Sequence, residues 1–271
     1  MAEDREVWCL HLDLGAPVAQ SHPFIHLDGP IAYAAGVESI GVDGLDELSD
    51  GDEPEYFTDE MPLRRYEVTS TGGDDEWVWA ASAAGIATPE DAADQSAPER
   101  WSTTRWRMRF DDDPVHQVKE THINTSSGEF KSYNAALPYA ATDSLTFFFE
   151  PAADATGEDV LELLKRHVGA IGKKRSQGFG RINDYRLTEA TGTVESALYH
   201  NGRVLCSMPA NYCTRVVPGT TIERRTVRPP YWHAENQCMA YPPFVDIPRD
   251  ELAPELPFAD HEAADQVAAG D

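Results

Sequence analysis

The segment from Asp143 to Leu187 constrains the fold most, because it reads as a strand, a capped helix, a glycine-rich turn and a second strand. The alternation and aromatic content of DSLTFFFEP predict the first strand. Thr156, with Asp159 three residues later, is typical of a capping box that opens a helix. We expect Gly172 to end this helix as a left-handed residue, after apolar residues at helical spacing: Val160, Leu161, Leu164, Val168 and Ile171. RINDYRL then predicts the second strand.

The N-terminal part predicts the same order of a strand followed by a helix. VWCLHLDL has the period-two pattern of a half-buried strand, with an apolar face made of Trp8, Leu10, Leu12 and Leu14. After a turn, Asp28 is placed to cap a helix whose first turn tolerates Pro30. The inward-facing residues of this helix would be Ile31, Ala34, Ala35 and Val37.

The middle of the chain is predicted to hold acidic loops and a hairpin. Residues 41–62 and 84–99 are acidic and turn-rich, and we expect loops or solvated insertions there. RWRMRF alternates arginines with apolar residues, which predicts a strand with its turn in DDDP and its returning strand in VHQVKETHI. YHNGRV predicts a further hairpin through Asn201-Gly202.

This order predicts an α+β protein with a ferredoxin-like βαββαβ sheet, the topology shared by the RRM. The expected domain spans residues 1–190 and carries the acidic insertion 41–99. A strand-rich part would follow over residues 191–245, and residues 246–271 would form an acidic tail, for which disorder is one alternative.

The formal net charge of −25 is spread unevenly along the chain. Residues 1–99 carry three basic and 23 acidic residues, and residues 246–271 carry one basic and eight acidic residues. The centre, residues 100–245, carries 18 basic and 16 acidic residues. Only five of the 22 basic residues are lysines, and this composition suggests a halophilic protein, whose large net charge is screened by salt.

Basic residues that remain in an acidic chain are grouped in the sequence, which favours a polyanionic partner such as nucleic acid. Ion pairs with the acidic segments are the alternative for each of them. The groups are Arg100, Arg105, Arg107 and Arg109; the six basic residues of Lys165–Arg181; and Arg224, Arg225 and Arg228.

Several kinds of site are not indicated. Gln177 stands where a Walker A loop that begins at Gly172 needs its second glycine, and the glycine turn follows a helix instead of opening one as G-x-G-x-x-G does. His22 and His26 are separated by Pro23 and are expected as loop histidines. No C-x-x-C pair occurs, so we expect reduced thiols, no metal site and no cofactor; the cysteines are Cys9, Cys206, Cys213 and Cys238.

The sequence gives no sign of a membrane partner. No apolar run approaches the roughly 18 residues of a membrane span. The N-terminus, MAEDREVW, lacks the basic-then-apolar pattern of a signal peptide. A cytoplasmic location is therefore expected.

The glycine turn has the composition of a phosphate-binding loop, because backbone N–H groups at glycine can approach an anion closely. Lys173, Lys174, Arg175 and Arg181 would supply charge, and Ser176 and Gln177 neutral donors. A helix end followed by a basic surface turn is the alternative.

Three segments together resemble a known family. AIGKKRSQGFGRI looks like the glycine-rich signature of the RAMP superfamily of CRISPR-associated proteins, and HLDGPIAYAA looks like the opening helix of the same proteins. RRTVRPPYW resembles a C-terminal segment of the type IV branch. The chain is thus similar to the subunit that binds the 5′ handle of the guide RNA in class-one effector complexes.

The resemblance implies a non-catalytic RNA-binding subunit with a β-hairpin thumb, placed here within residues 101–140. Its partners would be the guide RNA, the backbone and other subunits and, within the assembled complex, target DNA. Phe179, Tyr133 or Trp232 would be candidates to stack on a base, with core packing as the alternative. The implied RNA-binding residues are Gly172, Lys173, Lys174, Arg175, Ser176, Gln177, Gly178, Phe179, Gly180 and Arg181 in the turn and Arg105, Arg107, Arg109 and Lys131 in the thumb.

Two other functions stay open at this point. An endoribonuclease that trims the guide precursor would need a base and an acid, for which His116, His122, His167 and Tyr133 are candidates without a distinctive spacing. An unrelated halophilic ferredoxin-like protein would bind a small anion or another protein instead.

Overall fold

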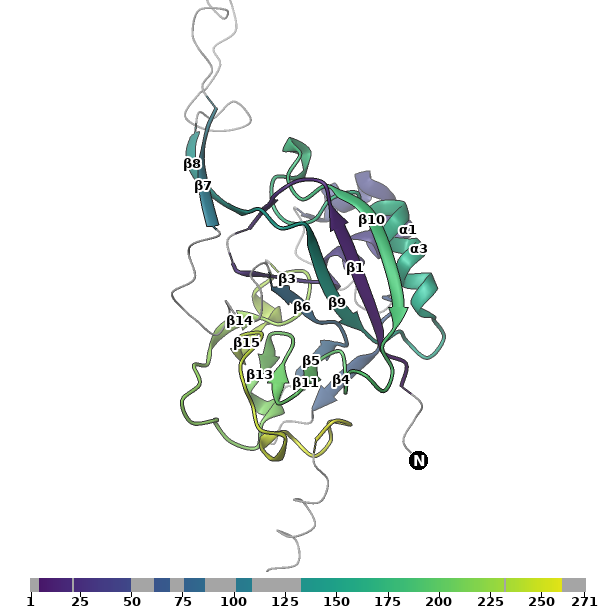
Figure 1. Cartoon of the computed structure of the whole chain (residues 1–271), viewed down its shortest axis with the longest axis vertical. Helices are drawn as coiled ribbons and strands as arrows, with labels where there is room; N and C mark the ends of the chain where they lie inside the picture. Colours follow the sequence, from purple (N-terminus) through teal and green to yellow (C-terminus); the bar gives the residue numbers. More distant parts are fainter. Residues whose placement is uncertain are drawn as a thin grey trace, which may run out of the picture.

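A computed structural model describes residues 5–20, 22–49, 61–68, 76–85, 101–108, 133–231 and 233–259 (Figure 1). For residues 46–49, 76, 101–108 and 133–138 the backbone alone is described. Within these ranges the chain forms a mixed α/β structure with two α-helices and several antiparallel sheets. No helix among the described residues is long and apolar enough to cross a membrane.

The main sheet has three antiparallel strands in the order β10-β1-β9. They are β1 (Trp8–Leu14), β9 (Ser144–Phe149) and β10 (Ile182–Glu189), which confirms the three strands predicted from their alternation. Leu10 lies opposite both Phe147 and Leu187, and its side chain is fully buried. Because β9 and β10 are both antiparallel to β1, they run parallel to each other with β1 between them.

Helices α1 (Asp28–Ser49) and α3 (Gly157–His167) cover one face of this sheet and share its core (Figure 1). The capping box is confirmed: the Asp159 N–H donates to Thr156 Oγ1 over 3.2 Å, and the Thr156 N–H donates to Asp159 Oδ2 over 2.8 Å. The predicted end of α3 at Gly172 is wrong. The helix ends at His167, because Val168 takes an extended conformation (φ −118°) that lets it and Ile171 stay buried in the core.

Helix α1 continues through residues that the sequence predicted as a loop. Gly41 interrupts it with φ 75° and ψ 171°, and the helix then runs to Ser49. Acidic residues indicate exposure to solvent, but they do not prevent helix formation. The expected loop of residues 41–62 is therefore wrong for 42–49, and residues 50–60 lie outside the described residues.

A two-stranded hairpin, β7 (Trp101–Met108) and β8 (Tyr133–Ala140), extends away from the body in Figure 1. Its register runs without a break from Trp101 opposite Ala140 to Met108 opposite Tyr133. The short strand β2 (Val18–Ala19) pairs with the base of β8. The strand that pairs with β7 is thus β8, whereas the expected returning segment, residues 115–123, lies outside the described residues.

Four short strands lie between the main sheet and the C-terminal part. β3 (Phe24–His26) pairs with β6 (Ala83–Gly85), and β4 (Arg65–Val68) pairs with β5 (Glu76–Trp79). Ala81, just before β6, forms an antiparallel bridge with Phe149 of β9.

The C-terminal part has its own core, around the fully buried rings of Tyr199, Tyr212 and Tyr241. Strands β11 (Tyr199–His200) and β12 (Arg203–Val204) form the predicted hairpin, with Asn201 and Gly202 both at positive φ. The other sheet has the order β13-β15-β14, made of Met208–Pro209, Gln237–Tyr241 and Glu223–Thr226. The 3₁₀ turns are Arg175–Gln177, Ala210–Tyr212, Ala234–Asn236 and Arg249–Glu251.

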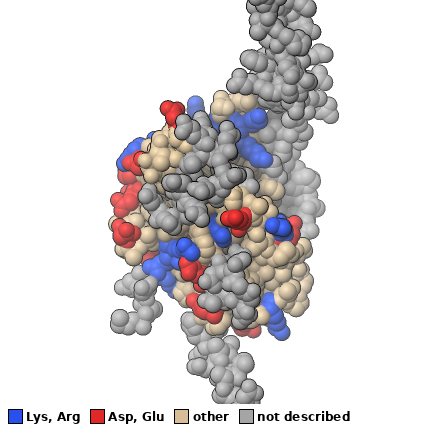
Figure 2. All heavy atoms as spheres, turned by 180° about the vertical axis from the view of Figure 1, so that it is seen from behind, with Lys and Arg blue, Asp and Glu red and all other residues tan. Residues whose placement is uncertain are grey.

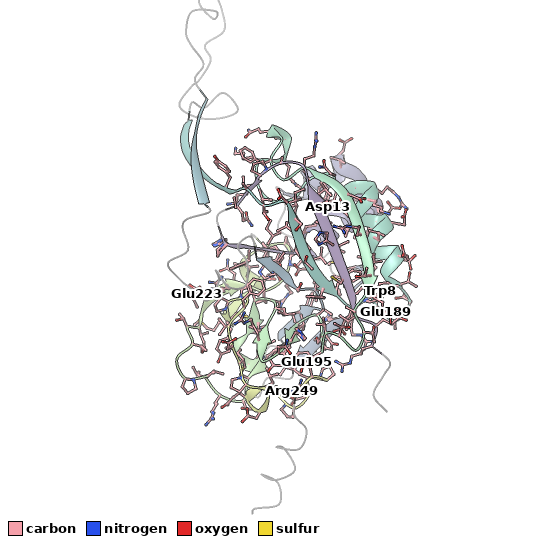
Figure 3. All side chains as sticks on the ribbon, in the orientation of Figure 1. Trp8, Asp13, Glu189, Glu195, Glu223 and Arg249 are labelled. Carbon is pink, nitrogen blue, oxygen red and sulfur yellow. The ribbon has the colours of Figure 1, made fainter. Side chains whose placement is uncertain are left out.

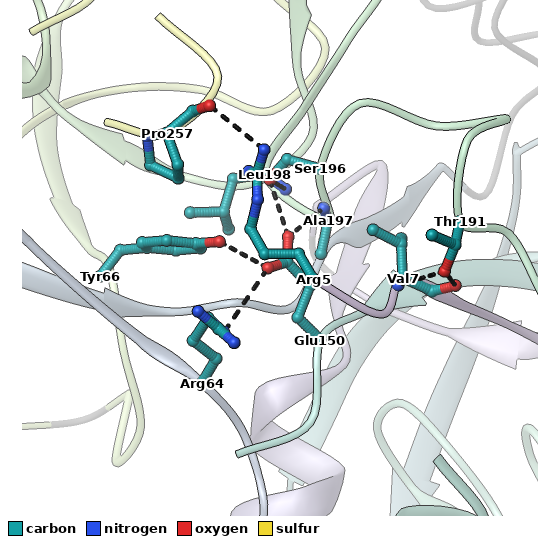
Figure 4. A network of polar contacts seen from close by, with 10 residues as sticks. All are labelled: Arg5, Val7, Arg64, Tyr66, Glu150, Thr191, Ser196, Ala197, Leu198 and Pro257. Atoms are coloured by element: carbon teal, nitrogen blue, oxygen red, sulfur yellow. Dashed lines mark hydrogen bonds and ion pairs between the residues drawn. The ribbon is translucent and has the colours of Figure 1, made fainter. Parts of the chain in front are cut away.

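A buried carboxylate connects the two cores (Figure 4). Glu150 follows β9 and is 1% exposed. Its oxygens accept from the Tyr66 hydroxyl over 2.5 Å and from Ser196 Oγ and the Ala197 N–H over 3.0 Å each, with Arg64 Nε at 4.0 Å. Because a buried charge needs such partners, this network fixes strand β9 against both β4 and the start of the C-terminal part.

Candidate nucleic-acid interface

The glycine turn, defined here as residues 172–181, is built on strand β2. The Lys173 N–H donates to the Ala19 carbonyl over 2.6 Å, and Gly172 has φ 85°. A Cβ on Gly172 would lie 2.8 Å from the Ala19 oxygen, so a side chain here would push the turn away from β2. The glycine is therefore required by the protein's own backbone.

Gly180 closes the turn on itself. Its N–H donates to the Pro17 carbonyl over 2.8 Å, and its carbonyl accepts from the Ile171 N–H over 2.9 Å. A Cβ on Gly180 would lie 1.8 Å from the Ile171 oxygen. By contrast, a Cβ on Gly178 would meet nothing within 4 Å. Of these three glycines, Gly178 alone has free space beside its Cα, although its N–H donates to the Arg175 carbonyl over 2.9 Å.

Most side chains of the glycine turn face solvent. Lys173, Arg175 and Arg181 are exposed, and so are Ser176 and Gln177. The Arg175 guanidinium carbon lies 5.0 Å from the ring centroid of Tyr33 on α1, which orients it by a cation–π contact. Figure 2 shows one group of Lys and Arg side chains in the upper part of the face shown, and further Lys and Arg side chains scattered among acidic ones lower down.

Lys174 has a backbone conformation that is rare for its residue type. Its φ of 58° and ψ of 35° are left-handed, and this costs a residue with a Cβ roughly 1–2 kcal/mol. The Gln177 N–H donates to the Lys174 carbonyl over 2.9 Å, which opens the 3₁₀ turn. The turn thus holds two adjacent lysines in a fixed backbone geometry.

Phe179 joins the glycine turn to the hairpin. Its ring lies 6.0 Å from that of Tyr139 on β8, at an angle of 53°, and it is half-buried. This contact gives Phe179 a packing role between the two candidate RNA-binding segments. Of the other aromatic candidates, Tyr133 is described by its backbone alone, and Trp232 lies outside the described residues.

The candidate residues of the hairpin are placed only in part. Arg105 and Arg107 lie on β7 opposite Ala136 and Asn134, so they belong to one face of the strand. Their side chains are outside the described residues, as are Arg109 and Lys131 altogether.

The structure adds residues that the sequence did not single out for this site. The exposed ring of His22 stacks on Phe24 at 5.8 Å and 17°, and the guanidinium carbon of Arg225 on β14 lies 5.6 Å from the Phe24 centroid. Partial burial lowers the pKa of His22, and the nearby charges of Arg225 and Lys173 lower it further. Arg225 belongs to the basic group RRTVR of the sequence, but only long-range packing brings it near residue 22.

The three segments that carry the family resemblance meet in space. Tyr231 donates from its hydroxyl to Asp28 Oδ1 over 2.5 Å, and its ring stacks on His26 at 5.5 Å. Asp28 is 3% exposed, and burial raises its pKa to about 7 although the Tyr231 hydrogen bond opposes the rise. HLDGPIAYAA thus contacts RRTVRPPYW through Asp28 and the glycine turn through Tyr33.

The ribonuclease candidates are not brought together in the described residues. His167 Nε2 lies 2.5 Å from Glu38 Oε2, and Arg166 pairs with the same carboxylate, on the helical face. His116 and His122 lie outside the described residues. Within the described ranges, no three His, Cys, Asp or Glu side chains are grouped as metal ligands.

The family model "CRISPR type IV associated protein Csf3" matches residues 10–243. No curated protein matches the chain. A chain of the "Cryo-EM structure of the Type III-B Cmr-beta bound to cognate target RNA" is 8% identical, with a TM-score of 0.31, over 69% of this chain and 61% of that chain. This chain therefore spans less than two thirds of that protein's length.

The resemblance to the type IV branch is confirmed by this match, which includes all three segments that carry the family resemblance. The protein belongs to the family of CRISPR type IV associated protein Csf3.

Proposed function

We propose that this protein is a non-catalytic, RNA-binding subunit of a type IV CRISPR effector complex, and that the glycine turn binds the 5′ handle of the guide RNA. One observation supports this most: the glycine turn presents Lys173, Arg175 and Arg181 to solvent in a chain of net charge −25. Guanidinium and ammonium groups on an exposed turn suit phosphate oxygens.

The proposal includes a ferredoxin-like fold of the RAMP superfamily. It is supported by β9 and β10, which are joined through α3 and lie on either side of β1. The bridge between Ala81 and Phe149 brings the segment before β6 beside β9, where the remaining strand of a ferredoxin-like sheet belongs.

The hairpin β7–β8 would act as the thumb that contacts the neighbouring backbone subunit and the RNA that enters it. It is supported by the way the hairpin is attached: β2 pairs with β8 and also carries the glycine turn. The Phe179–Tyr139 contact joins the same two parts. RNA bound to the turn would therefore lie at the base of the thumb.

Purification at high salt, followed by sequencing of the RNA that copurifies, tests the proposal. We expect RNA with one constant 5′ end, whereas random fragments or no RNA would contradict it. The triple variant Lys173→Ala, Lys174→Ala and Arg175→Ala should lose most of this RNA. Each phosphate contact adds about 0.7 to the slope of log affinity against log salt. The loss of three contacts should therefore reduce this slope by about 2.

A matched control removes three arginines that pair with carboxylates elsewhere. Arg186 donates to Asp13 over 2.8 Å, and Arg203 donates to Asp246 over 2.9 Å. Arg249 pairs with Glu195, and both are labelled in Figure 3. Exposed pairs of this kind contribute ~0–1 kcal/mol to stability. The triple alanine control should keep both the fold and the RNA; equal loss in both variants would mean that net charge, not the turn, holds the RNA.

A further inference from the structure

Four aromatic rings form a continuous row from the protein surface to a buried carboxylate. This aromatic row consists of His22, Phe24, His26 and Tyr231. The consecutive ring centroids are 5.8, 5.3 and 5.5 Å apart. The inner ring, Tyr231, is held by the buried Asp28, and the outer ring, His22, is exposed. The outer face of the row is thus a fixed platform that ends in solvent.

Basic residues from two distant parts of the chain stand beside this platform. Lys173 belongs to the glycine turn, and Arg225 belongs to β14. Both charges lower the pKa of His22, with Glu223 as an opposing carboxylate that also pairs with Arg225. A lowered pKa favours the neutral imidazole, whose flat ring can stack without adding charge.

We propose that the exposed ring of His22 stacks on one unpaired base of a single-stranded RNA, and that Lys173 and Arg225 bind the phosphates on either side of it. This inference rests on the proposed function and extends it. The RNA path would leave the glycine turn, cross the aromatic row and reach β14 of the C-terminal part. Arg225 then belongs to the RNA-binding surface.

Single-stranded RNA fits this platform better than a protein partner does. Every base has a π-face, so a flat ring flanked by cations accepts any sequence, as on other stacking platforms. A bound peptide would need an apolar groove or an open strand edge instead. Arg225 contacts the aromatic row directly, because its guanidinium carbon lies 5.6 Å from the ring centroid of Phe24.

His22→Ala and His22→Phe in the full-length protein test the inference. Binding of the copurifying RNA, or of a mixed-sequence single strand of about 12 nucleotides if none copurifies, is measured by fluorescence anisotropy across a range of salt. His22→Ala should weaken binding by about tenfold at every salt concentration. His22→Phe should keep the affinity, because it keeps a ring.

Arg225→Ala should act differently from His22→Ala. It removes a phosphate contact, so the salt dependence should flatten by about 0.7 in log–log slope. The matched control is His11→Ala on β1, whose ring contacts Thr146 over 3.0 Å and no part of the aromatic row. It should bind RNA as the unchanged protein does, and thermal unfolding of each variant confirms that it is folded.

Two results would overturn the inference. Unchanged RNA binding by His22→Ala would show that the platform does not lie on the RNA path. The same conclusion would follow if His22→Ala lost only its assembly with a protein subunit. Equal weakening by His22→Phe and His22→Ala would exclude stacking. If the triple lysine–arginine variant of the glycine turn also keeps its RNA, the proposed function itself fails; if that variant loses RNA, only the platform is wrong.

Discussion

The hydroxyl of Tyr231 donates to the carboxylate of Asp28 across 203 positions of sequence, over a distance of 2.5 Å. Asp28 begins helix α1, and Tyr231 follows strand β14. Since Asp28 is 3% exposed, this hydrogen bond supplies a partner that water cannot provide. It therefore fixes the C-terminal part against the helix that also touches the glycine turn.

Removal of this hydroxyl should destabilise the protein. Tyr231→Phe keeps the ring against His26 but leaves Asp28 without its side-chain donor, which should cost about 1–3 kcal/mol in the free energy of unfolding. Chemical denaturation measures the change. Tyr33→Phe is the control, since the ring of Tyr33 contacts Arg175 and would be kept; a similar loss in both variants would contradict a specific role for Tyr231.

Asp28 should make stability depend on pH. Its pKa is raised by burial from 3.8 to about 7, so the folded protein binds a proton that the unfolded chain releases between these values. The contribution of Asp28 to the free energy of unfolding is thus fully present below pH 4 and is lost as pH rises to about 7. Asp28→Asn should remove this fall in stability with pH, and equal slopes in both proteins would contradict the raised pKa.

His26 should change the stability of the protein with pH in the opposite direction to Asp28. Burial lowers its pKa from 6.5 to about 3, so its contribution is present above pH 6.5 and is lost as pH falls toward 3. In the unchanged protein the two effects oppose each other over their shared range. The free energy of unfolding should therefore be measured at each pH for both Asp28→Asn and the unchanged protein. In the difference between the two proteins, the His26 contribution largely cancels.

Replacement of two glycines of the turn by alanine should destabilise the protein to different extents. In Gly180→Ala the new methyl group would lie 1.8 Å from the Ile171 oxygen, at a φ of 62°, and we expect a loss of more than ~3 kcal/mol. Gly178→Ala meets no atom within 4 Å and should cost only ~1 kcal/mol. Thermal unfolding separates the two; equal losses would contradict the described geometry.

Gly178→Ala also tests the approach of RNA to the backbone. Because the variant is expected to fold, weaker RNA binding would indicate that a phosphate or ribose lies against this residue. If the variant binds RNA as tightly as the unchanged protein does, RNA contacts only the side chains of the turn.

Repeat RNA should not be cut by the purified protein in the presence of a chelator. Metal-free cleavage needs a paired base and acid, and in the described part of the chain His167 is bound to Glu38 on the helical face. Gel analysis of end-labelled RNA is the measurement. A single specific cut would contradict the non-catalytic proposal, and His22→Ala and His167→Ala would then show which histidine takes part.

Local sequence patterns were sufficient to predict the strands and helix ends that depend on neighbouring residues alone. Strands β1 and β9 follow from alternation, and the start of α3 follows from the Thr156–Asp159 capping box. The end of α3 was misplaced because Gly172 is left-handed for another reason. Its positive φ serves the turn against Ala19, which lies 153 positions away in sequence.

The candidate site shows the same limit. The glycine turn was found from its composition, and its backbone geometry explains two of its glycines as contacts within the protein. The sequence gave no reason to place His22 in an RNA-binding site, because His22 and His26, separated by Pro23, are expected as loop histidines. Its importance comes from Phe24, Arg225 and Lys173, which reach it only in the folded chain.

The second core has a consequence for any attempt to divide the protein. Tyr66, Val68 and Val78 belong to the N-terminal half of the sequence but are buried with Tyr199 and Tyr212. A fragment that ends near residue 190 would leave these side chains without a covering surface, and one that begins there would lack part of its interior. The two parts of this chain are therefore not separable domains, and the surface that we propose for RNA needs the intact polypeptide.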